Sequence, residues 1–220
     1  QFNIYTDRTV KAVVEAPGYL VSAVSQELFT VVQTGAYDTF DNDTIDPDLW
    51  SPSVQFGGRV YESSTFYLGP GVSTTTAGTI NVYGFYHVTG QTGVGHLRST
   101  YAALEWQFDI AAQYMPDTSG GTQGWQILAE DPYNGSRVRL LSNLTNTHLA
   151  DQNDVAGVYR ATHTGSTIEV YRDLGNGFEL LYTHAAGGVS GRFRLYVVAN
   201  NAHGDGVKSA VALDNVSALR

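Results

Sequence analysis

The sequence contains no cysteine, which excludes two kinds of structure. Without thiols the chain can form neither disulfide bonds nor metal sites built on thiolate ligands. Its 220 residues can bury a sizeable core without such crosslinks, so we expect one domain, or one domain with an appendage. No apolar run approaches the length of about 18 residues that a membrane-spanning helix requires, and we expect no membrane insertion.

Positive charge is scarce as well. The 12 lysines and arginines face 21 aspartates and glutamates, which gives a formal net charge of −9, and the only lysines are Lys11 and Lys208. A chain this acidic offers no electrostatic footprint to nucleic acids or anionic lipids, because both bind through clusters of positive side chains. We therefore expect no nucleic-acid partner.

What the sequence has in quantity is typical of β-structure. It contains 24 glycines and 14 tyrosines at only 15% charged residues, a composition that favours short strands joined by turns. The clearest strand is expected at residues 101–114. Along it Leu104, Trp106, Phe108 and Ile110 share one face, which we expect to be buried, and polar residues share the other.

The succession of strand and turn signals predicts an all-β fold. Residues 167–171 and 178–182 flank the turn sequence DLGNG, a strong hairpin signal. From about residue 37 onward, short strands recur without a convincing long helix or an internal repeat. Such spacing is typical of an antiparallel sandwich or a barrel.

The first part of the chain differs from the rest. We expect an N-terminal extension over residues 1–36 and a main domain over 37–220. The β-branched content of the extension favours strands, which either add to the chain's own sheet or complete the sheet of a neighbouring subunit. A helical stripe is the alternative, formed by Val21, Val24, Leu28 and Val31.

Three regions of the main domain resemble a known family. Residues 40–50, FDNDTIDPDLW, resemble the opening of concanavalin-A-like, laminin-G-like jelly rolls. The segments that resemble the late hairpin and the closing strands of that family are 168–173, 178–182, 194–199 and 211–216. The resemblance covers about residues 38–220 and implies an antiparallel β-sandwich, a concanavalin-A-like jelly roll, whose last strand pairs near the first. It leaves function open, because this fold carries lectins, glycan-binding modules, glycanases, lyases and scaffolds.

Jelly-roll glycanases of the laminarinase type carry Glu-x-Asp-x-Glu on a strand that faces the sugar. Here Glu105 matches the first position, Gln107 replaces the central aspartate, and Asp109 is a shorter replacement for the second glutamate. Cooperating carboxylates must lie about 5–9.5 Å apart, whereas Cα atoms four residues apart on a strand are separated by about 13 Å. We therefore expect a non-catalytic member of the family, with a solvated polar face at this strand.

Two kinds of ligand site remain as hypotheses. The resemblance implies that related jelly rolls hold structural calcium where the first and last strands meet, so Asp41, Asp43 and Asp214 are the candidate ligands. The acidic residues near position 40 can instead serve as turn formers. No cofactor is required otherwise, and the six histidines show no zinc spacing. Aromatic rings that could stack on sugars are Tyr61, Tyr67, Tyr83, Tyr86 and Trp125, with a core role as the alternative.

Several features fit an extracellular or cell-surface protein. The chain begins at Gln1, as expected for a mature secreted product. N-glycosylation sequons begin at Asn42, Asn134, Asn143 and Asn215.

We expect a non-enzymatic structural or surface protein that assembles into a homo-oligomer or filament through residues 2–34. The alternative is a glycan-binding, lectin-like module, and less favoured is a glycoside hydrolase or polysaccharide lyase.

Overall fold

The structure is a computed structural model, and it divides the chain into two compact units, Gln1–Thr34 and Gly35–Arg220. It describes residues 8–12, 25–29, 37–55, 58–69, 72–86, 93–114, 124–144, 156–173, 175–201 and 206–219. In the first unit, β1 (Arg8–Ala12) and β2 (Ser25–Phe29) pair antiparallel and place Val10 opposite Glu27. Leu28 therefore lies in a strand, whereas the rest of the predicted helical stripe lies outside the described residues.

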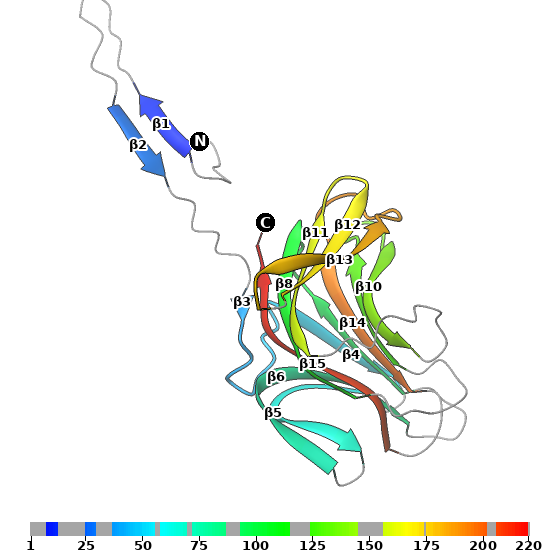
Figure 1. Ribbon diagram of the computed structural model, residues 1–220. Helices are drawn as coiled ribbons and strands as arrows, with labels where there is room; N and C mark the ends of the chain where they lie inside the picture. The colour runs from blue at the N-terminus through cyan, green and yellow to red at the C-terminus, as the bar shows by residue number, and fades with distance from the viewer. Residues whose placement is uncertain are drawn as a thin grey trace, which may run out of the picture. The chain divides into compact units, whose positions relative to one another are not determined.

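The second unit is a sandwich of two antiparallel sheets, as the sequence predicts (Figure 1). The smaller sheet has five strands in the order β10–β9–β14–β7–β4. These strands are β4 (Trp50–Gln55), β7 (Gly93–Ser99), β9 (Gly124–Glu130), β10 (Arg137–Leu144) and β14 (Arg194–Asn201).

The larger sheet has eight strands, of which seven run in the order β13–β12–β11–β8–β15–β6–β5. They are β5 (Arg59–Gly69), β6 (Val72–Tyr86), β8 (Glu105–Tyr114), β11 (Gly157–His163), β12 (Thr167–Asp173), β13 (Phe178–Ala185) and β15 (Gly206–Ala218). The short first strand of the unit, β3 (Tyr37–Asp38), pairs with β15, so the last strand does meet the first. In the described residues there is no helix long and apolar enough to cross a membrane.

The core lies between the sheets and depends on the alternation of β8. Trp106, Phe108 and Ile110 are almost wholly buried, and the Trp106 indole N–H donates to the Phe193 carbonyl at 2.8 Å. Phe108 stacks on Tyr159 of β11, with ring centroids 6.0 Å apart. The expected register of β8 is therefore confirmed.

Leu104 is the exception, because the strand begins only at Glu105 and Leu104 is half-buried before it.

The opening segment is fixed to the core by one carboxylate. Asp38 accepts hydrogen bonds from the Phe40 backbone N–H and from the Trp50 indole N–H, each at 2.9 Å. This arrangement holds Phe40 at a positive φ of 54°, where its ring packs on Trp50 with 5.7 Å between centroids. The chain passes so close to β6 that a Cβ atom at Gly78 would lie 2.2 Å from the Phe40 carbonyl oxygen. Only glycine fits there.

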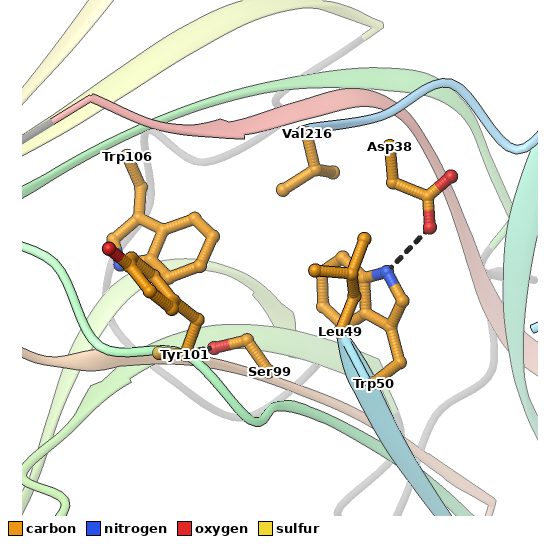
Figure 2. A pocket seen from close by; sticks show the side chains of 7 residues that line it. All are labelled: Asp38, Leu49, Trp50, Ser99, Tyr101, Trp106 and Val216. Carbon is orange, nitrogen blue, oxygen red and sulfur yellow. Dashed lines mark hydrogen bonds between the residues drawn. The ribbon is translucent and has the colours of Figure 1, made fainter. Parts of the chain in front are cut away.

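A small apolar pocket lies beside Asp38 and Trp50, and Figure 2 shows the hydrogen bond between these two residues at the edge of the pocket. Its lining residues are Asp38, Leu49, Trp50, Ser99, Tyr101, Trp106 and Val216. The pocket has room for about one water molecule and therefore not for a sugar ring.

The burial of Trp106 makes a stability prediction. Replacing a buried aromatic residue by alanine leaves a cavity, so Trp106→Ala should lower the free energy of unfolding by about 3–5 kcal/mol in urea denaturation. Tyr133→Ala is the matched control, because Tyr133 is 93% exposed and its loss should change stability by less than about 0.5 kcal/mol. Equal stability of the two variants would contradict the register of β8.

Candidate functional site

The side of the larger sheet that faces away from the smaller sheet is called the outer face here. Because Trp106, Phe108 and Ile110 point into the core, Glu105, Gln107 and Asp109 alternate onto this outer face. The neighbouring strand β11 places Thr162, Arg160 and Val158 opposite these three residues, in that order. The outer face thus has a polar centre on β8.

On one side of β8, a cation and two aromatic rings form a cluster. Arg160 lies opposite Tyr171 of β12, and its guanidinium lies 4.9 Å from the centroid of the Tyr171 ring and 4.4 Å from that of Phe178. The Tyr171 hydroxyl donates to Glu169 at 2.6 Å. This hydrogen bond, more than burial, raises the pKa of Tyr171. These contacts hold the guanidinium and the two rings together, and all three groups are half-buried.

On the other side of β8, two carboxyl groups face each other. Asp109 lies directly opposite Asp214 of β15, where a bulge follows and Asn215 adopts a φ of 47°. The Asn215 side-chain amide donates to Asp109 at 3.0 Å, and the Asn215 backbone N–H donates to Asp214 at 2.7 Å. Side chains directly opposite each other on paired strands have Cβ atoms about 4.5–5.5 Å apart. The outer face therefore carries a close carboxyl pair.

The environment of this pair favours protonation. Burial raises the pKa of Asp109, and the hydrogen bond from Asn215 opposes that effect. Burial also raises the pKa of Asp214, and the negative charges of Asp109 and Asp41 raise it further. The shift of Asp109 follows from burial, and that of Asp214 follows from burial together with neighbouring negative charge.

Farther along, the outer face carries a tyrosine cluster. Tyr61 of β5 stacks on Tyr83 of β6 with 5.2 Å between ring centroids, and Tyr114 at the end of β8 packs against the same cluster. Tyr61 and Tyr114 are half-buried, whereas Tyr83 lies fully beneath them.

The predicted sugar platforms are thus placed unequally. Tyr61 lies on the outer face, and its role stays a prediction. Tyr83 and Trp125 are fully buried, and Trp125 belongs to the core between the sheets, so neither ring is accessible for stacking on a sugar. The alternation of its strand points Trp125 into the core, whereas Tyr83 is covered by Tyr61. The side chains of Tyr67 and Tyr86 lie outside the described residues.

Sequence reasoning missed the cluster of Arg160, Tyr171 and Phe178. The available signal was the outward position of Arg160 and Tyr171 in strands whose alternate residues, Ala161 and Val170, are buried. What the sequence could not supply was the register that brings these strands together.

The predicted calcium ligands come together only in part. Asp41 is close enough to Asp214 to raise its pKa, but in the described part of the chain no three acidic or histidine side chains are grouped to hold a metal. Asp43 is exposed, at a φ of 55°. Nearby polar side chains form turns instead, since Asn42 accepts from the Thr44 backbone N–H and Asp46 from that of Asp48.

The four sequons differ in surroundings. Asn42 and Asn134 are exposed, whereas Asn143 and Asn215 are half-buried. The side-chain amide of Asn134 donates to Gly188, that of Asn143 to Gln113, and that of Asn215 to Asp109. Modification of any of these amides would displace its hydrogen bond, and the four sites stay predictions.

The carboxyl pair predicts an unusual stability profile. A carboxyl whose pKa is raised by folding binds its proton more tightly in the folded state, so stability is lost as the pH rises through that raised pKa. Asp214→Asn removes the charge but keeps an oxygen for the Asn215 N–H. The variant should be more stable than the wild type at pH 7 in urea denaturation, and the difference should shrink towards about pH 3, where the unperturbed carboxyl is also protonated.

The control for this measurement is Glu179→Gln, which changes an exposed carboxylate on β13 and should leave stability nearly unchanged. A variant Asp214→Asn that is less stable than the wild type at pH 7 would contradict the assigned direction of the pKa shift.

Comparison with known proteins supports the fold. No protein-family model matches the sequence, and no curated protein does. A mixed-linkage glucan GH16 protein from Bacteroides ovatus, in complex with a G4G4G3G product, matches with a TM-score of 0.54 at 9% identity, over 83% of this chain and 98% of that one. An uncharacterised protein from Mycobacterium paratuberculosis matches with a TM-score of 0.50 at 12% identity, over 82% and 98% of the chains.

The exoplasmic/lumenal domain of VIP36 in a Ca²⁺/Man2-bound form matches more distantly, with a TM-score of 0.43 at 9% identity, over 83% and 87% of the chains. Identities this low concern the fold alone. The two-sheet domain from β3 to β15 therefore has a concanavalin-A-like jelly-roll fold, as the sequence motifs implied.

Proposed function

We propose that this protein binds glycan chains, without cleaving them, on the outer face of the larger sheet. The observation that carries the proposal is the cluster of Arg160, Tyr171 and Phe178 beside the polar centre of β8. An extracellular or cell-surface location is part of the proposal.

The chemistry of the outer face suits a sugar. Aromatic rings pack against the apolar C–H faces of sugar rings, and planar polar side chains hydrogen-bond the hydroxyls. Tyr171 and Phe178 supply rings, while Gln107, Arg160 and Asp109 supply amide, guanidinium and carboxyl groups in adjacent register positions. A row of such groups across adjacent strands fits an extended oligosaccharide better than a compact ligand.

The absence of cleavage rests on the arrangement of carboxyl groups. Glu105 is only 7% exposed, and the neutral Gln107 lies between it and Asp109 on the same face. Glycoside hydrolysis is the second candidate because Asp109 and Asp214 lie opposite each other, and a close carboxyl pair can supply a nucleophile and an acid. The pKa of both groups is shifted in the same direction, whereas a glycanase site pushes the pKa values of its two carboxyls apart.

Binding is tested with neutral β-glucan oligosaccharides by isothermal titration calorimetry. Tyr171→Ala removes a ring from the outer face and should weaken binding at least about tenfold, since one stacked ring contributes on the order of 1.5 kcal/mol. Tyr133→Ala, an exposed tyrosine in the loop between β9 and β10, is the control and should bind like the wild type. Thermal unfolding of both variants verifies that they are folded.

Two results would overturn this function. Equal affinities of wild type and Tyr171→Ala would remove the outer face as the site. Release of reducing sugar by the wild type, abolished in Asp109→Asn and Asp214→Asn, would establish the hydrolase instead.

A second proposal concerns the N-terminal unit. A sheet of only two strands is marginally stable in water, so the β1–β2 pair gains stability when a further strand adds to it. Self-association through this pair would provide that strand.

Sedimentation of the full chain and of residues 35–220 tests self-association. The full chain should form oligomers that persist in high salt, because main-chain and apolar contacts are little screened, and the shortened chain should be a folded monomer. A full chain that stays monomeric at all concentrations would contradict assembly.

A further inference from the structure

The charges of this acidic protein are divided between its two sheets. The five strands of the smaller sheet carry one carboxylate, Glu130, and four arginines, which are Arg98, Arg137, Arg139 and Arg194. The larger sheet has the opposite balance, with seven carboxylates against four basic residues on its seven main strands.

All four arginines lie on the side of the smaller sheet that faces away from the larger one. Their strand neighbours Leu97, Val138 and Leu195 are buried in the core, so the alternation of each strand turns the arginines outward. This surface, defined by the four arginines, is called the arginine face below.

Strand register gathers the arginines within a small area. Arg137 and Arg194 lie opposite Glu130 from its two sides. In the next outward row, Arg139 lies opposite Leu128, and Tyr196 lies between Leu128 and Arg98. The strand spacing puts the Cα atoms of Arg139 and Arg98 about 14 Å apart, and the Cα atoms of the two rows are separated by about 7 Å.

Half of this positive charge is held in place by Glu130. Its carboxylate forms ion pairs with Arg98 at 2.6 Å and with Arg137 at 2.7 Å. Both guanidiniums also lie over the ring of Tyr196, at 4.9 and 4.2 Å from its centroid. Their side chains are still 36% and 43% exposed, so each fixed guanidinium has edges that remain open to solvent.

The other two arginines have no such neutralisation. Among the described residues, neither Arg139 nor Arg194 forms an ion pair with a carboxylate. The strands of the smaller sheet thus carry a net positive charge of about three on a chain whose formal net charge is −9.

We propose that the arginine face binds an anionic polysaccharide, a chain that carries sulfate or carboxylate groups at intervals. Guanidinium groups bind such oxyanions through paired N–H donors. The backbone positions of the four arginines span about 14 Å, which exceeds the reach of one small anion but matches a chain with repeated charges. This site is on the opposite side of the sandwich from the proposed site for neutral glycans and does not depend on it.

Polar side chains next to the arginines favour a sugar over other polyanions. Ser51 lies opposite Arg98, and Ser53 lies opposite His96 in the following row. Gln126 occupies that same row, across Val198 of β14 from His96. These groups can hydrogen-bond the hydroxyls that a polysaccharide carries between its charged groups, whereas the backbone of duplex DNA carries no hydroxyl.

The test measures binding of the full chain to heparin and to alginate, which carry sulfate and carboxylate groups, with neutral dextran as the uncharged comparison. Arg139→Gln/Arg194→Gln removes the two unpaired cations and leaves the Glu130 ion pairs intact. We expect the wild type to bind heparin or alginate but not dextran. The variant should bind at least about tenfold more weakly and with a smaller dependence of log K on log salt.

The matched control is Arg59→Gln/Lys208→Gln, which removes the same charge from strands β5 and β15 of the larger sheet and should bind like the wild type. Failure of the wild type to bind either anionic polysaccharide, or equal weakening in both double variants, would overturn the proposal. Equal affinity for duplex DNA would overturn the assignment to a sugar. Dimerisation at low salt that Arg139→Gln/Arg194→Gln abolishes would replace the polysaccharide by the acidic surface of a second copy.

Tyr171→Ala separates this inference from the proposed function. It should leave heparin and alginate binding unchanged, whereas Arg139→Gln/Arg194→Gln should leave binding of neutral β-glucan unchanged.

Discussion

Strand β8 lies near the middle of the larger sheet, and the alternation of its side chains constrains both surfaces of that sheet. Trp106, Phe108 and Ile110 must be buried, since their exposure would remove the centre of the core. Gln107 and Asp109, which alternate with these three residues along the strand, must then lie on the outer face. The core and the candidate glycan site are therefore two consequences of one strand, and a shift of one residue would exchange them.

The outer face shows how strand pairing brings polar side chains from distant segments of the chain together. Asp109 and Asp214 are separated by most of the domain in sequence, yet the pairing of β8 with β15 puts them opposite each other. A bulge then turns Asn215 towards Asp109, where its amide offsets part of the cost of the buried charge. This pair differs from a glycanase site, in which the environments of the two carboxyls push their pKa values apart.

Charge separation between the sheets gives the domain two unlike outer surfaces. The larger sheet presents carboxyl groups with aromatic rings, while the smaller sheet presents arginines around a single glutamate. The net charge of −9 hides this division, because an average over the chain says nothing of where the few cations lie. An acidic protein can thus carry a locally positive surface.

The sequence by itself determined the local properties of this protein. Period-two alternation identified the buried face of β8, the DLGNG turn identified the hairpin of β12 and β13, and the opening and closing motifs indicated the jelly roll with its last strand beside its first. These features depend on neighbours along the chain. Tertiary structure alone decided which ring is accessible, so that Trp125 and Tyr83 are buried while Tyr171 lies beside Arg160. It also decided that Asp109 meets Asp214 and that four arginines share one surface, because strand order and register are set by packing between segments far apart in sequence.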